Sequence, residues 1–86
     1  MSLRLQAHLG TLRQMEILLA VYDSGSVSGA AETLHLTQPT ISMQLKKLAD
    51  VIGFPLYNIV GRKVVFTEAG LEIVKAATEI LNNFAR

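Results

Sequence analysis

Apolar side chains recur every three or four positions through most of the chain, the spacing that places them on one face of a helix. The first stripe consists of Met15, Leu18, Leu19 and Tyr22. It predicts a helix over about 12–24. Thr11, with Gln14 three positions on, has the form of a capping box before this helix. Gly25 stands where a left-handed residue is expected to end it.

Two further helices are predicted, each with a hydroxyl side chain at its start. Ser26 and Thr37 are good N-caps, because a hydroxyl oxygen accepts a bond from an unpaired backbone N–H. The stripe of the second helix consists of Val27, Ala30, Ala31 and Leu34. The stripe of the third consists of Ile41, Leu45, Leu48 and Ile52. Pro39 falls in a first turn, where proline costs no helical hydrogen bond. Gly53 and Pro55 are expected to end the third helix.

Residues 56–66 are β-branched and aromatic on both sides of Gly61-Arg62, which predicts a short hairpin. Thr67 then caps a fourth helix that runs to the end, with Glu68 favourably placed against the helix dipole. This helix carries two apolar stripes, although one buried face needs only one. One consists of Ile73, Ala77, Ile80 and Phe84. The other, here called the Leu71 stripe, consists of Leu71, Val74, Thr78, Leu81 and Ala85. We expect the Leu71 stripe to pair with a second copy of the chain.

The order helix, helix, helix, hairpin, helix predicts a mainly α fold. The second and third helices are joined only by residues 35–37, as in a helix-turn-helix, and the hairpin that follows makes the motif winged. We therefore expect a winged helix-turn-helix of three helices and a short hairpin wing, followed by a long C-terminal linker helix. Its parts are an N-terminal tail at 1–10, the winged domain at 11–66 and the linker or dimerisation helix at 67–86.

The third helix would then be the recognition helix, which enters the major groove with its first residues at the base edges. Gln38 can form paired hydrogen bonds with adenine, and Ser42 can bond several bases. The Met43 thioether can meet a thymine methyl group. Pro39 presents an apolar ring in the same turn. These four side chains are the predicted base contacts.

The cations lie where a winged helix meets DNA. Lys46 and Lys47 suit phosphates, which set the register of the protein without reading sequence. Arg62 and Lys63 lie at the hairpin tip, where an arginine can enter a narrow minor groove and the lysine can contact the backbone. Alone, each feature has an ordinary explanation, such as a solvated helix face or charges that protect an edge strand. Their joint occurrence favours DNA binding.

The net charge supports DNA binding only when it is counted separately for residues 37–66 and for the remainder of the chain. The 86 residues are 50% hydrophobic, too apolar for a disordered chain, and carry a net charge of +1. Residues 37–66 hold four cations and one anion, a net +3, against −2 for the remainder. The positive charge is therefore concentrated on the predicted DNA face. The lack of cysteine excludes disulfides, thiolate zinc sites and a cysteine nucleophile.

Other classes of function find little support. The longest apolar run, residues 17–22, is far shorter than the ~20 residues of a membrane span, and we expect a cytoplasmic protein without a membrane partner. His8 and His35 are too isolated to form a metal site. No serine or threonine has a visible base and orienting acid, so we expect no catalytic site and no cofactor. A winged-helix module that binds protein instead of DNA stays open as an alternative.

Residues 12–70 resemble the N-terminal DNA-binding domain of LysR-type transcriptional regulators. The matching pieces, in unbroken order, are LRQ at 12–14, GSVSGAA at 25–31, LHLTQPTIS at 34–42, QLKKL at 44–48, GFPLY at 53–57 and FTEAG at 66–70. The resemblance implies binding to promoter DNA as a dimer whose linker helices pair antiparallel. It also implies a small-molecule effector domain outside these residues, in a protein that usually assembles as a tetramer.

The resemblance also implies roles for single residues. It makes Gln38, Pro39 and Ser42 base readers and Arg62 the minor-groove residue of the wing. It implies backbone contacts by Ser28, Thr37, Thr40 and Lys46. Two departures stand out: Met43 occupies a position where the family often has arginine, and Asn58-Ile59 replaces a common acidic-basic pair. Both remove cations from the DNA face, so we expect weaker or differently tuned affinity.

Overall fold

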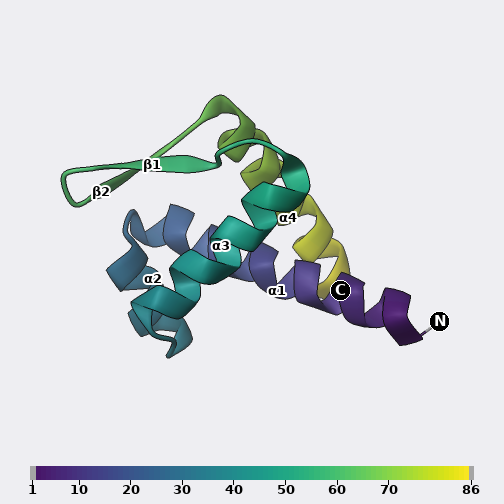
Figure 1. The fold of residues 1–86 in the computed structure, drawn as a ribbon. Coiled ribbons are helices and arrows are strands. Elements are labelled where there is room, and N and C mark those ends of the chain that lie inside the picture. The colour runs from purple at the N-terminus through teal and green to yellow at the C-terminus, as the bar shows by residue number, and fades with distance from the viewer. Residues whose placement is uncertain (1, 86) are drawn as a thin grey trace.

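The computed structural model describes the backbone of residues 2–85 and the side chains of residues 12–83. Figure 1 shows a winged helix-turn-helix, which confirms the predicted fold class. Its elements are α1 (Ser2–Ser24), α2 (Val27–Leu34), α3 (Gln38–Ile52), β1 (Tyr57–Val60), β2 (Lys63–Phe66) and α4 (Glu68–Ala85). The wing and the first turns of α3 point to one side of the molecule, while the beginning of α1 and the end of α4 lie towards the other.

The predicted start of the first helix is wrong. Helix α1 begins at Ser2, so residues 2–10, expected as a tail, are helical, and Thr11 lies inside the helix and does not cap it. This segment is rich in leucine and other helix-forming residues. Its one interior glycine, Gly10, costs about 1 kcal/mol, which is too little to end the helix.

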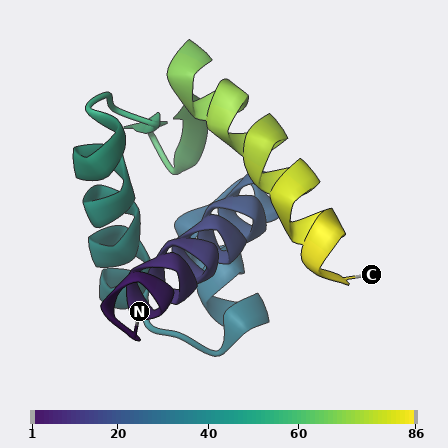
Figure 2. The ribbon, with the colours of Figure 1, turned by 90° about the vertical axis from the view of Figure 1, so that its right-hand side faces the viewer.

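The buried face of α1 is also turned from the predicted one. Ile17, Leu18 and Val21 are fully buried, whereas Tyr22 is 47% exposed. The reason is that α1 contacts α2, α3 and α4. Figure 2 shows α3 and α4 on either side of it. A helix surrounded in this way is buried over more than one stripe, and the position of its neighbours decides which margin stays open.

The local signals around the helix-turn-helix are confirmed. The Ser26 hydroxyl accepts a hydrogen bond of 2.9 Å from the Gly29 N–H, and the Thr37 hydroxyl accepts one of 3.3 Å from the Thr40 N–H. His35 ends α2 in the left-handed region, with φ of 56°. These caps satisfy backbone N–H groups that have no partner inside a helix. Together they fix the angle at which α3 leaves the turn.

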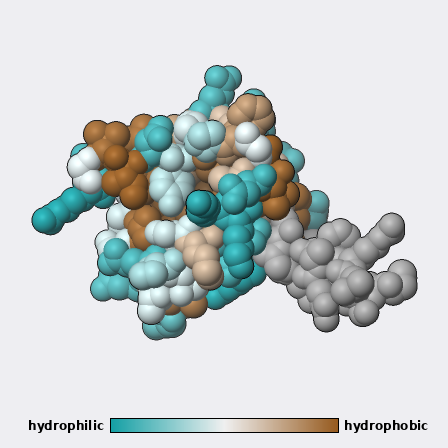
Figure 3. All heavy atoms as spheres, viewed as in Figure 1, coloured by the Kyte–Doolittle hydropathy of each residue, from teal (hydrophilic) through white to brown (hydrophobic). Residues whose placement is uncertain are grey.

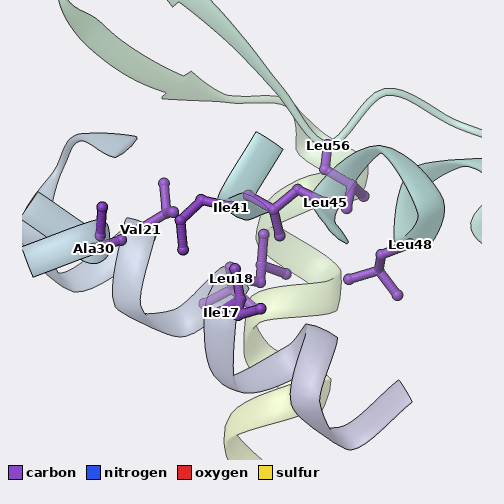
Figure 4. Close-up of a cluster of buried hydrophobic side chains, with 10 residues drawn as sticks. Ile17, Leu18, Val21, Ala30, Ile41, Leu45, Leu48 and Leu56 are labelled. Carbon is purple, nitrogen blue, oxygen red and sulfur yellow. The ribbon is translucent and has the colours of Figure 1, made fainter. Parts of the chain in front are cut away.

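A single core joins all four helices to the residue that precedes the wing. Figure 4 shows its larger side chains pointing towards one another from α1, α3 and the loop, with Ala30 of α2 beside Val21. The buried members are Ile17, Leu18, Val21, Ala30, Ala31, Ile41, Leu45, Leu48, Leu56 and Val74. The predicted stripe of α3 is confirmed for its first three residues, and Ile52 packs half-buried at its end.

Helix α4 corrects the predicted Leu71 stripe. Val74 is 7% exposed and belongs to the core of its own domain, so it is not available to a second chain. It lies in one line with Gly70 and Ala77, which are both buried. Two of these three residues are small, and α4 therefore packs closely on its own domain along a line that hydrophobicity alone does not show. The other members of the Leu71 stripe are exposed (Leu71, Thr78), half-buried (Leu81) or outside the described side chains (Ala85).

Gly70 is the point of closest approach between α4 and the loop that enters the wing. A Cβ built on Gly70 would overlap the Leu56 carbonyl. The Thr67 N–H donates to that same carbonyl at 3.0 Å, and the Thr67 hydroxyl donates to the Pro55 carbonyl at 2.7 Å. One backbone and one side-chain hydrogen bond therefore fix the base of the wing to the start of α4, and the Leu56 backbone leaves no room for a larger side chain at Gly70.

Replacing Gly70 with alanine should consequently destabilise the fold by about 1–3 kcal/mol, because backbone would have to move. Helix propensity alone predicts the opposite sign, since alanine is favoured over glycine by about 1 kcal/mol. Urea unfolding measures the difference. Ala76→Ser, at an exposed position of the same helix, is the control and should change stability by less than about 0.5 kcal/mol. An alanine variant as stable as the wild type would contradict the close approach.

Candidate nucleic-acid interface

The outward face of α3 carries most of the predicted DNA contacts. Pro39, Met43, Lys46 and Asp50 follow one another at spacings of four, three and four, which places them in one line opposite the buried stripe. All four are exposed. Gln38 and Lys47 are nine residues apart, about two and a half turns, so they lie on opposite flanks of the helix. The solvent face of α3 is therefore a broad arc and not a single row.

One flank of this arc meets the wing. Gln38 from α3, Ser28 from α2 and Arg62 from the turn of the wing line one open groove. A second groove shares Ser28 and Gln38 and follows the helix-turn-helix to Thr37. Three residues that sequence reasoning placed on separate elements are thus brought together. Lys46, Lys47 and Met43 line neither groove and lie further along α3.

Among the side chains of residues 12–83, no carboxylate forms an ion pair with the cations of this face. Among the residues that the structure describes, the one ion pair joins Arg13 and Glu16, at 3.9 Å on α1. The four cations between residues 37 and 66 are exposed, namely Lys46, Lys47, Arg62 and Lys63. A phosphate could approach them without breaking an existing ion pair.

The hydroxyl groups of the interface are already part of its architecture. The Thr37 and Thr40 hydroxyls lie 2.8 Å apart, and Thr40 is half-buried. The Ser28 hydroxyl lies 3.4 Å from that of the cap residue Ser26. A hydroxyl has one donor and two acceptor sites, so each can serve the helix start and still bond a phosphate oxygen.

Two residues of the grooves were missed by sequence reasoning. Glu32 lines the groove of Ser28 and Gln38, and it adds a negative charge that the count over 37–66 leaves out. Its position four residues after Ser28 on the same helix was the available signal. Ile59 lines the wing groove with Arg62 and is 59% exposed. From the sequence, Ile59 stands out only as a position that lacks a cation.

The wing itself is a two-stranded antiparallel hairpin whose register pairs Tyr57 with Phe66 and Val60 with Lys63. Gly61 makes the turn with φ of +66°, a conformation that favours glycine. Exposed apolar side chains continue along the strands at Ile59, Val60 and Val65. Figure 3 shows this hydrophobic area over the wing, beside hydrophilic side chains that project past it. The wing thus offers both cations at its tip and apolar surface behind them.

The base of the wing is anchored in the core through half-buried Tyr57 and Phe66. Burial raises the pKa of the Tyr57 phenol above its ordinary value of 10.0, because removal from water disfavours the charged phenolate. In the unfolded chain this group ionises at lower pH than in the folded protein. Its contribution to stability is therefore fully present below the unfolded pKa and is lost as pH rises through the folded pKa.

The wild type should consequently lose stability above about pH 10 more steeply than Tyr57→Phe, which keeps the ring and removes the ionisable group. Urea unfolding at a series of alkaline pH values measures the two slopes. Tyrosinate absorbance should show a delayed titration in the folded wild type that the variant lacks. Equal slopes for the two proteins would rule out burial of the phenol at the base of the wing.

A helix-turn-helix whose second helix starts with exposed polar residues, next to a hairpin with a cationic tip, defines the class of winged helix-turn-helix DNA-binding proteins. The model of the LysR family of bacterial regulatory helix-turn-helix proteins matches residues 12–71. The chain belongs to this family, whose members are transcription regulators and not enzymes.

Known proteins agree with this assignment. The chain is 49% identical over 70 residues to the HTH-type transcriptional activator CmpR of a Synechocystis species. The aligned region covers 81% of the chain and 23% of that protein. It is 48% identical over 63 residues to a RuBisCO operon transcriptional regulator of Allochromatium vinosum, covering 73% of the chain and 21% of that protein. The chain thus spans about a quarter or less of the length of these relatives.

Solved structures with the same fold include complexes with DNA. A crystal structure of a CbnR DNA-binding domain in complex with DNA has a TM-score of 0.83 and 32% identity, covering 87% of this chain and 86% of that one. A complex of the BenM DNA-binding domain with benA site 1 DNA has a TM-score of 0.81 and 30% identity, covering 86% and 83%. These matches support a DNA-binding regulator over the protein-binding alternative. Within residues 2–85, no helix is both long and apolar enough to cross a membrane.

Proposed function

We propose that this chain binds double-stranded promoter DNA sequence-specifically, with α3 in the major groove and the wing in the minor groove. The observation that carries the proposal is the groove lined jointly by Gln38 of α3 and Arg62 of the wing. A duplex presents its major and minor grooves side by side. One continuous surface that holds a base-reading amide and an arginine suits both grooves at once.

Base reading is assigned to the first half of α3. Gln38, Pro39, Ser42 and Met43 are exposed and lie on the part of the arc nearest the helix start. The amide of Gln38 matches the donor and acceptor edge of adenine, and the apolar parts of Pro39 and Met43 match thymine methyl groups. These contacts carry the sequence preference.

Backbone contacts surround this centre. We assign them to Ser28, Thr37 and Thr40 at the helix starts and to Lys46, Lys47 and Lys63 as cations, and we assign Arg62 to the minor groove. The hydroxyls lie where the helix N-termini add a favourable dipole for phosphate. Glu32 and Asp50 lie on the same side and limit the electrostatic attraction. Affinity should therefore depend on fitted contacts as well as on charge.

The chain is further proposed to act as a homodimer through α4. Leu71 is 48% exposed, Thr78 is exposed, and Leu81 lines an open groove with Leu19 and Leu34. Leu71, Thr78 and Leu81 follow one another at spacings of seven and three, which places them along one side of α4. Two copies joined there would present two recognition helices to two half-sites. Because the chain spans less than a quarter of its relatives, we propose that it is part of a longer regulator. For that regulator we propose an effector domain, assembly as a tetramer and a cytoplasmic location.

Selection of bound duplexes from a random pool should yield one preferred half-site for the wild type. Gln38→Ala should relax the preference at a single base pair and cost ~1–3 kcal/mol there. Lys47→Gln, on the opposite flank of α3, is the matched comparison. It should weaken binding to all sequences alike and reduce the salt slope by about 1. Equal losses for every sequence in Gln38→Ala would exclude direct base reading by Gln38.

Leu71→Glu should weaken dimerisation at least tenfold, because a carboxylate would enter an apolar contact between two α4 helices. Sedimentation measures the monomer–dimer equilibrium. Val51→Glu is the control, since Val51 is also exposed and apolar but lies at the end of α3. A dimer equally strong in all three proteins would show that Leu71 does not lie between the chains.

A further inference from the structure

An aromatic contact joins the end of α1 to the base of the wing. Tyr22, in the last turns of α1, packs its ring against Phe66 of β2, with ring centroids 5.4 Å apart and planes at 80°. This is the edge-to-face arrangement that aromatic pairs favour. Phe66 in turn contacts Tyr57 of β1, with centroids 6.1 Å apart and planes at 46°. Three rings therefore connect α1 with both strands of the wing.

Tyr22 is not a core residue in the usual sense. It is 47% exposed, whereas its neighbour Val21 is fully buried, and α1 is already held by Ile17 and Leu18. No hydrogen bond of its hydroxyl is found among the described residues. What the ring contributes is its contact with Phe66, so its role concerns the wing more than the stability of the helices.

A backbone hydrogen bond adds a second link between the end of α1 and β2. The Val64 N–H of β2 donates to the Gly25 carbonyl at 3.4 Å. Gly25 is itself fixed, because its N–H donates to the Val21 carbonyl at 2.8 Å to close α1. In the turn between α1 and α2, Gly25 therefore bonds the wing, and the next residue, Ser26, caps α2.

The wing needs such a connection, because a two-stranded hairpin is marginally stable alone. Each strand has four residues, so the tip lies roughly 13 Å beyond the base at about 3.3 Å per residue. A rotation of roughly 10° at the base would then move Arg62 by about 2 Å, which is enough to lose a hydrogen bond with a groove edge. The position of Arg62 beside Gln38 thus depends on what holds the base.

We propose that Tyr22 is a positioning residue for DNA binding, which sets the orientation of the wing through Phe66 and so the place of Arg62. The proposal rests on the proposed function of the α3 and wing surface. Tyr22 is not assigned any contact with DNA. The aromatic ring performs this role and the hydroxyl does not. Phenylalanine at this position should therefore preserve the orientation of the wing, whereas a smaller or non-aromatic side chain should not.

The first test needs no DNA. Amide hydrogen exchange of the free protein should show faster exchange at Val64 in Tyr22→Ala and in Tyr22→Leu, with Leu45 in α3 unchanged. Tyr22→Phe should match the wild type at both amides. Leucine keeps apolar bulk without the ring, so it separates aromatic contact from simple burial. Unchanged exchange at Val64 in the alanine variant would overturn the proposal, as would an equal rise at Leu45.

The second test uses duplexes selected by the wild type. Tyr22→Ala should weaken binding about three- to tenfold, from the loss of an aromatic pair, and lose minor-groove protection under the wing while keeping major-groove protection under α3. Tyr22→Phe should restore both. In an Arg62→Ala background, Tyr22→Ala should cause no further loss of affinity. In a Gln38→Ala background, the fold-losses of the two substitutions should multiply, because the two residues act independently. A loss of the same size in both backgrounds would mean a general structural role and overturn the proposal.

The two tests also separate this proposal from the one it rests on. If the wild type bound no duplex, the proposed function would fail while the exchange data still decided whether Tyr22 holds the wing. If Arg62→Ala bound as tightly as the wild type, the minor-groove role of the wing would fail, and Tyr22 could not act through it. If Arg62→Ala lost affinity and Tyr22→Ala did not, only the positioning role would be wrong.

Discussion

The structure depends on burial of the second half of α1 between three other helices. Helices α2, α3 and α4 all contact α1, whose fully buried side chains are Ile17, Leu18 and Val21. A chain of 86 residues without cysteine has no cross-link to replace this contact. Because α3 rests on α1, the direction of the recognition helix is set by apolar packing on its inner side. Its outer side is left free for polar residues that contribute little to the fold.

This division explains why local features of the fold could be predicted and packing could not. The hydroxyls of Ser26, Thr37 and Thr67 accept hydrogen bonds from the backbone N–H groups of Gly29, Thr40 and Gly70, each three residues away. Their sequence neighbours therefore suffice to identify them. The same holds for Gly61 between two β-branched segments. The exposure of Tyr22 and the burial of Val74 depend instead on where other helices cross. A small residue such as Gly70 marks such a crossing only once the neighbouring backbone is known.

The candidate site divides in the same way. Gln38, Ser42 and Arg62 could be proposed from residue type and from the places where winged helices meet DNA. That Gln38 and Arg62 share one groove with Ser28, and that Glu32 lies in the next, follows from the angle between α2, α3 and the wing. No spacing rule contains that angle, because it is set by the core and by contacts such as that between Tyr22 and Phe66.

The interface has a low net positive charge because apolar and acidic side chains lie among its cations. Met43 and Ile59 place exposed apolar atoms beside Pro39 on α3 and beside Arg62 on the wing, while Glu32 and Asp50 oppose phosphates. Non-specific binding comes almost entirely from cations and phosphates, whereas apolar contacts with methyl groups and sugars need a close fit. A surface with few cations loses more from its affinity for arbitrary DNA than from its affinity for a fitted site. Precise placement of the wing therefore matters more here than on a strongly basic surface.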